Sequence, residues 1–128
     1  MFIYNDIQKT NMDDAQILQD FAQQHIVQAE NFVQTNQWGE ALHMYEQAHS
    51  VLDAVALRQP DNVNIKQTLN ALTITIHDLP LAAKVFNIME KIESCEDPQQ
   101  AHQDAQHITS MIKHKTLQQH LENILTSS

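Results

Sequence analysis

Acidic and histidine side chains recur at every third residue in one stretch of the chain, a spacing that could hold a metal ion. The four residues are Glu40, His43, Glu46 and His49. A di-iron carboxylate bundle needs two Glu-x-x-His pairs and two further Glu, all projecting inward from facing helices. Residues that step by three drift about 60° per step around a helix, so four in a row cannot converge on one ion. We therefore predict no metal site and expect these side chains on a solvated helix face.

Nucleophilic chemistry has equally little support. Cys95 is the only cysteine, and Glu93 and Glu96 beside it oppose formation of the reactive thiolate. A phosphorelay transfer domain follows its reactive histidine with Lys and a small residue, whereas His49 is followed by Ser, Val, Leu and Asp. A chain with a single glycine cannot form a Gly-rich phosphate loop. The sequence therefore predicts no catalytic residue, no cofactor and a protein that is not an enzyme.

The composition is typical of an all-α protein. One Gly and three Pro in 128 residues leave almost none of the turn signals that a β-rich chain requires. The length suits a single domain, over residues 1–128, that can bury its own core. A lone cysteine and an N-terminus without a basic region or a long apolar run predict a cytoplasmic protein.

The net charge of −9 lies mainly in the first half of the chain. Residues 1–64 carry nine acidic side chains against two basic ones, Lys9 and Arg58. Such a field disfavours nucleic acid and anionic membranes, which bind through Lys and Arg, and it steers cationic partners toward the protein. The expected partner is another protein with basic or apolar segments, with no nucleic acid and no membrane involved.

Apolar residues recur at spacings of three and four along the chain, which predicts amphipathic helices. We expect about six helices in three antiparallel pairs. Asn36 and Gln37 should form the first turn, and Asp97 and Pro98 should start a helix. Two breaks are expected, one before Pro80 and another near Lys113 to Lys115. The pairs are a first hairpin over 13–58, a second hairpin over 61–94 and a C-terminal helical cap over 98–126. In the last helix, Leu117 and Leu121 either pack back on the preceding pairs or meet a second copy, so the expected state is a monomer or a homodimer.

The first predicted hairpin carries the residues of a known repeat. Ala29 and Phe32 place a small residue and an aromatic on its first helix, and Ala41 and Tyr45 place an alanine and an aromatic on its second. The chain resembles a tetratricopeptide repeat over roughly residues 22–94. A second copy is expected at a constant offset. In it, Trp38, Ala41, Tyr45, Ala48 and Val51 align with Leu79, Ala82, Phe86, Met89 and Ile92.

The resemblance implies an α-α superhelix that binds peptides or helices of other proteins in a groove lined by the first helix of each pair. Carried over position by position, the groove residues are Gln23, Ile26, Glu30, Val33, Asn64, Gln67, Ala71 and Ile74. None of them is basic, so a ligand that presents a carboxylate is not expected. We predict an adaptor or chaperone that holds a helical or extended, partly basic segment of a partner protein.

Three other interpretations stay open. A plain helical bundle without repeats explains the same apolar stripes. A stoichiometric inhibitor, such as an immunity protein for a bacterial toxin or a blocker of a nucleic-acid-binding enzyme, explains the acidity. It would use the N-terminal acidic residues Asp6, Asp13, Asp14 and Asp20. A structural subunit of a secretion or pilus assembly is the third.

Overall fold

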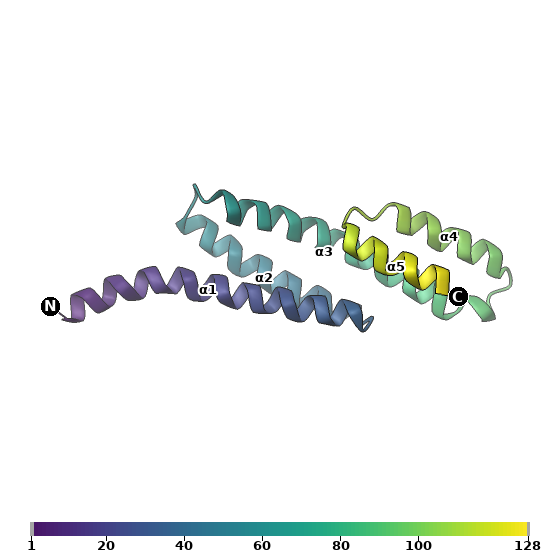
Figure 1. Cartoon of the computed structure of the whole chain (residues 1–128), viewed down its shortest axis with the longest axis horizontal. Coiled ribbons are helices and arrows are strands. Elements are labelled where there is room, and N and C mark those ends of the chain that lie inside the picture. The colour runs from purple at the N-terminus through teal and green to yellow at the C-terminus, as the bar shows by residue number, and fades with distance from the viewer. Residues whose placement is uncertain (1, 128) are drawn as a thin grey trace.

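The computed structural model describes the backbone of residues 2–127 and the side chains of residues 14–127. The elements are α1 (Phe2–Gln34), α2 (Trp38–Arg58), α3 (Val63–Glu90), the short 3-10 helix η1 (Ile92–Ser94), α4 (Pro98–Ser110) and α5 (Lys115–Ser127). No strand occurs in this described part, so the predicted all-α class is confirmed. Figure 1 shows an elongated molecule, with α1, α2 and the first half of α3 at one end and α4 and α5 beside the second half of α3 at the other.

Four alanines are among the most deeply buried residues of α1 and α2. Ala22 and Ala29 on α1 and Ala41 and Ala48 on α2 are each at most 1% exposed. Small side chains allow two helix backbones to approach closely along their length. The turn between the helices uses Asn36, which has a φ of 61°, a left-handed conformation that Asn tolerates better than most residues. The first predicted turn is therefore confirmed, although α1 begins at Phe2 rather than at Asp13.

The expected break before Pro80 is wrong, because α3 runs from Val63 to Glu90 as one helix. A proline in a helix interior costs about 3 kcal/mol through its missing N–H and its bulky ring. Here the ring is exposed, while Leu79 beside it is 1% exposed and Ala82 is fully buried. The buried stripe thus continues without interruption past the proline. Residues 61–94 are consequently not a hairpin, and the chain has five α-helices rather than six over the described residues.

The C-terminal helices begin and end at the predicted signals. The Asp97 side chain accepts a hydrogen bond from the Gln100 N–H at 3.1 Å, which caps the start of α4. The chain leaves the helical conformation between α4 and α5, so the predicted break near Lys113 to Lys115 is confirmed. Leu117, Leu121 and Leu125 of α5 are buried within the chain, where this stripe packs back on the other helices.

One continuous apolar core joins both ends of the molecule. Trp38, at the first turn of α2, is 8% exposed, and its ring lies inclined to those of Phe86 of α3 and His120 of α5, with ring centroids 6.0 Å apart in each pair. It is therefore a core residue. No helix in the described range is both long enough and apolar enough to cross a membrane.

Candidate functional site

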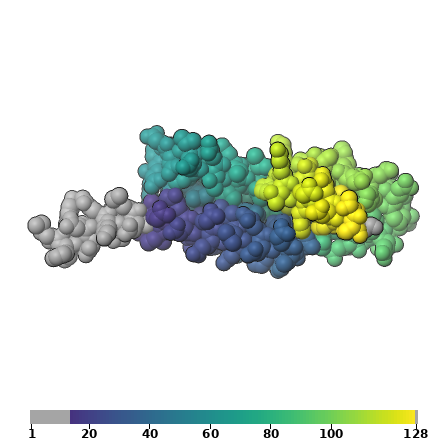
Figure 2. Space-filling model, in the orientation of Figure 1, coloured from purple at the N-terminus to yellow at the C-terminus, as the bar shows by residue number. Residues whose placement is uncertain are grey.

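A groove runs between α1 and α3, with α2 as its floor. Both outer helices pack against α2, and two hollows are each lined by residues of all three helices. The floor residues are Leu52 in one hollow and Tyr45 in the other, two helical turns apart on α2 or roughly 10 Å. In Figure 2, α1 and the first half of α3 stand on the same face, with α2 deeper between them and α5 beside one end of the groove.

The first hollow, which we call the amide hollow, has a volume of about 180 Å³. It is lined by Gln19, Ala22, Gln23, Ile26, Leu52, Asn62, Asn64, Ile65 and Thr68. Gln23 and Asn64 are exposed, and neither side chain forms a hydrogen bond within the described structure. A free carboxamide both donates and accepts hydrogen bonds. This hollow can therefore pair with the backbone N–H and C=O groups of a peptide.

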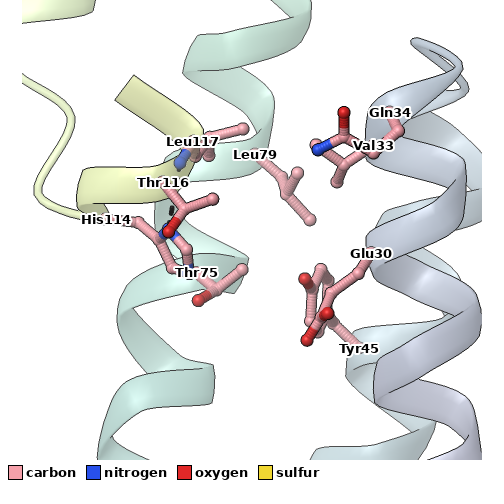
Figure 3. Close-up of a pocket in the computed structure, with 9 residues that line it drawn as sticks. All are labelled: Glu30, Val33, Gln34, Tyr45, Thr75, Leu79, His114, Thr116 and Leu117. Atoms are coloured by element: carbon pink, nitrogen blue, oxygen red, sulfur yellow. Dashed lines mark hydrogen bonds between the residues drawn. The ribbon is translucent and has the colours of Figure 1, made fainter. Parts of the chain in front are cut away.

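The second hollow, which we call the Glu30 pocket, has a volume of about 260 Å³ (Figure 3). It is lined by Glu30, Val33, Gln34, Tyr45, Thr75, Leu79, His114, Thr116 and Leu117. Its walls come from four segments, because α1, α2, α3 and the start of α5 each contribute side chains. Glu30 is the only carboxylate among the lining residues, and no Lys or Arg lies among them.

The negative charge of Glu30 acts on the Tyr45 hydroxyl in this pocket. Tyr45 is 5% exposed, and burial, followed by the negative charge of Glu30, raises the pKa of Tyr45 to about 12. Both effects penalise the phenolate, so the hydroxyl stays protonated at neutral pH. The pocket therefore presents a neutral phenol beside an exposed carboxylate.

A buried carboxylate on α3 positions the α5 side of the Glu30 pocket. Asp78 is 1% exposed, and its Oδ2 accepts hydrogen bonds from the backbone N–H groups of Lys113 and His114, each at 2.9 Å. His114 in turn accepts the Leu117 N–H at its Nδ1, 3.1 Å away, which begins α5. These bonds hold His114 and Leu117 at the pocket wall.

Five of the eight predicted groove residues line the two hollows. Gln23, Ile26 and Asn64 line the amide hollow, and Glu30 and Val33 line the Glu30 pocket. The other three, Gln67, Ala71 and Ile74, are exposed on α3 and line neither hollow. On α3 the groove is lined instead by Asn64, Ile65, Thr68, Thr75 and Leu79.

The residues of α3 that were predicted to face the groove follow the repeat pattern. That pattern assumes a helix that ends before Pro80 and is followed by a turn. Successive α-helical residues are about 100° apart, so Ile74 and Gln67 point roughly 100° and 80° away from Thr75, whereas Ala71, one turn before Thr75, lies at the edge of the same face. Sequence reasoning also missed Tyr45 and His114 as pocket residues. The available signal for Tyr45 was a phenol on an otherwise apolar stripe, since a buried hydroxyl needs polar surroundings. Nothing in the sequence pointed to His114.

The histidine and acidic face of α2 lies outside the groove. His49 approaches Thr73 Oγ1 of α3 at 3.2 Å and Asp53 at 3.9 Å, while Glu46 lies on the same rim. Within the described residues, no three His, Cys, Asp or Glu side chains lie close enough to hold a metal ion. Cys95 is half-buried and donates its S–H to the Lys91 carbonyl oxygen at 3.2 Å.

The acidic side chains are not neutralised by neighbouring lysines or arginines. Over residues 14–127, the ion pairs within 4.0 Å are His49 with Asp53 and His77 with Asp78, and neither involves Lys or Arg. Of the N-terminal acidic residues, Asp20 is exposed and Asp14 is half-buried, whereas the side chains of Asp6 and Asp13 lie outside the described ones. The negative charge in the first half of the chain is thus not cancelled by ion pairs with Lys or Arg among the described residues.

Comparison with known proteins identifies no relative: the chain matches no family model, no curated protein and no solved structure.

Proposed function

We propose that this protein is a non-catalytic protein-binding module that holds a segment of another protein in the groove between α1 and α3. The observation that carries the proposal is the pairing of two unlike hollows along one groove. The unbonded amides of Gln23 and Asn64 line one hollow, and a carboxylate with apolar walls lines the other. An extended or helical segment that crosses both would find backbone hydrogen bonds at one end and a side-chain pocket at the other.

The tetratricopeptide-like part of this proposal rests on α1 and α2. Ala29, Ala41 and Tyr45 are buried between or beside these helices, as that hairpin requires. The first half of α3 supplies the opposite wall in the place of a second repeat's first helix. An adaptor or chaperone of cytoplasmic location is the role that we propose on this basis.

The experiment that tests the groove introduces a bulky side chain into it. We expect Gln23→Trp to fill the amide hollow and abolish capture of the partner, because Gln23 is exposed and lines that hollow. The matched control is Asn31→Trp, since Asn31 is exposed on the same helix and lines neither hollow. Tagged versions of both variants and of the parent protein are incubated with lysate of the source cells, and bound proteins are quantified by mass spectrometry. Equal loss of capture in both variants, or no loss in either, contradicts the groove.

The unpaired acidic surface favours a second candidate, a stoichiometric inhibitor of a basic toxin or nucleic-acid-binding enzyme. Such an inhibitor would recognise one folded partner through its charged face. The reversal Asp20→Lys then weakens capture more than Glu30→Lys does, because Asp20 lies outside both hollows and Glu30 lies inside one. The groove proposal predicts the opposite order.

A further inference from the structure

The Glu30 pocket combines a single negative charge with neutral acceptors and apolar walls. Glu30, Tyr45 and Thr75 offer side-chain oxygens from three different helices. The apolar wall consists of Val33, Leu79 and Leu117, which are each at most 8% exposed. In Figure 3, Glu30, Tyr45 and Val33 lie on one side of this space, and Thr75, Leu79 and Leu117 lie on the other. Each side thus carries both polar and apolar side chains.

The acceptors of this pocket are largely unused within the protein. The Glu30 carboxylate forms no ion pair and no hydrogen bond with any described side chain. Thr75 donates its hydroxyl hydrogen to the Ala71 carbonyl at 3.0 Å, which leaves its oxygen lone pairs free to accept. Lys115, which stands between the lining residues His114 and Thr116 in the sequence, lines a neighbouring hollow with Gln34 and Thr116. A positive group can therefore enter without displacing an internal partner.

The ligand that fits is long, apolar along its stem and positively charged at its tip. A lysine side chain buries its methylenes against apolar surface and keeps a charged head among polar groups. Its ammonium has three N–H donors that point in different directions, and Glu30, Tyr45 and Thr75 provide acceptors from different directions. An arginine directs its donors in one plane and pairs best with the two coplanar oxygens of one carboxylate, which would leave the Tyr45 and Thr75 oxygens unused. The one carboxylate here lies across the pocket from the Thr75 hydroxyl.

We propose that the Glu30 pocket receives a lysine side chain of the bound partner, with its ammonium among Glu30, Tyr45 and Thr75 and its methylenes against Val33, Leu79 and Leu117. This inference rests on the proposed function, because the lysine belongs to the segment held in the groove. The partner segment would carry this lysine about 10 Å from the part that pairs with the amide hollow.

The test uses small probes that mimic side chains, followed by backbone amide NMR shifts of the whole protein. The probe for lysine is n-butylammonium, the probe for arginine is n-propylguanidinium and the uncharged control is 1-butanol. We expect n-butylammonium to shift the amides of Thr75, Leu79 and Leu117 and to bind more tightly than either other probe. Glu30→Gln should weaken n-butylammonium binding about tenfold, because the amide oxygen can still accept a hydrogen bond from the ammonium but no longer carries the negative charge that strengthens it. The control Glu40→Gln removes the same charge from an exposed site that lines neither hollow and should leave binding within about twofold.

Two outcomes overturn the lysine assignment: no saturable shift at these amides, or tighter binding of n-propylguanidinium. An equal loss in Glu30→Gln and Glu40→Gln also overturns it, because it would show attraction by the overall field alone. Failure of the lysine pocket differs from failure of the groove. If Gln23→Trp abolishes partner capture while n-butylammonium does not bind, the groove stands without a lysine pocket. If n-butylammonium binds while Gln23→Trp leaves capture intact, the pocket stands and the proposed function falls.

Discussion

The α1–α2 hairpin and the α4–α5 pair are held in place by different kinds of contact. Between α1 and α2, the buried residues include four alanines, and no side-chain hydrogen bond joins these two helices in the part of the chain that the structure describes. The α4–α5 pair buries larger side chains such as Leu121, and hydrogen bonds also hold it against the rest of the molecule. Asp78 accepts two backbone N–H groups of the α4–α5 connection, and His120 lies 2.9 Å from the Asn36 side-chain oxygen.

The difference follows from how far apart in sequence the contacting helices lie. A short turn already brings α1 and α2 together, and the small alanine side chains buried on both helices leave room for them to lie close. The start of α5 lies more than thirty residues after Asp78, so the chain connection does little to fix its position on α3. Hydrogen bonds from buried polar groups fix the position of α5 on α3 instead. The α5 side of the Glu30 pocket thus depends on polar contacts, whereas the α1–α2 side depends on packing.

The largest expected effect comes from removal of the Asp78 carboxylate. Asp78→Ala leaves the Lys113 and His114 N–H groups without their acceptor and should lower the free energy of unfolding by about 2 to 4 kcal/mol. Urea unfolding measures this loss, and hydrogen exchange should show it first in α5. The control Asp78→Asn keeps an accepting oxygen and should lose less. Equal stability of Asp78→Ala and the parent would show that apolar packing alone docks α5.

A larger side chain between α1 and α2 should destabilise this hairpin before it affects α5. Ala41 is fully buried, so Ala41→Leu forces α1 and α2 apart and should cost about 1 to 3 kcal/mol in urea unfolding. Ala54→Leu is the control, because Ala54 is exposed on the same helix. Hydrogen exchange should rise in α1 and α2 before α5. If the two leucine variants are equally stable, the alanines do not set the helix separation.

Pro80 lies between the two regions, on the helix that connects them. Pro80→Ala restores a backbone N–H to the middle of α3 and should raise the free energy of unfolding by about 1 to 2 kcal/mol. The side chain is exposed, so little packing is lost. Thermal and urea unfolding both measure the gain. A loss of stability instead would mean that the proline shapes α3 so that α4 and α5 can dock.

The smallest effect is the response of the His120 contact to pH. Burial lowers the pKa of His120 below its ordinary value of 6.5. The unfolded chain therefore takes up this proton first as the pH falls, so the contribution of His120 to stability is present above about pH 6.5 and is lost below it. His120→Gln keeps a donor for Asn36 and removes the titration.

Urea unfolding of the parent and of His120→Gln at about pH 7.5 and about pH 5.5 isolates this contribution from that of the other histidines. The parent should lose more stability on acidification than the variant does. The same loss in both proteins would show that His120 does not sense pH in the folded state.

The sequence predicted the local features of the fold well. The turn at Asn36, the cap at Asp97 and the break near Lys113 to Lys115 all lie where capping and turn residues stand. These signals act within one helical turn, so neighbouring residues suffice to recognise them. On α1, the residues that the resemblance to the repeat placed in the groove, Gln23, Ile26 and Glu30 among them, do line the two hollows.

The sequence by itself determined that the chain is helical, where most of its helices begin and end, and that its first two helices form a pair. Only the tertiary structure decided that α3 continues past Pro80 and that α5 completes the Glu30 pocket. The physical reason is the same in both cases. Burial of Leu79 and the bonds from Asp78 to Lys113 and His114 depend on residues that are distant in sequence. The free energy of these contacts outweighs the cost of a proline inside a helix only once the helices have packed against each other.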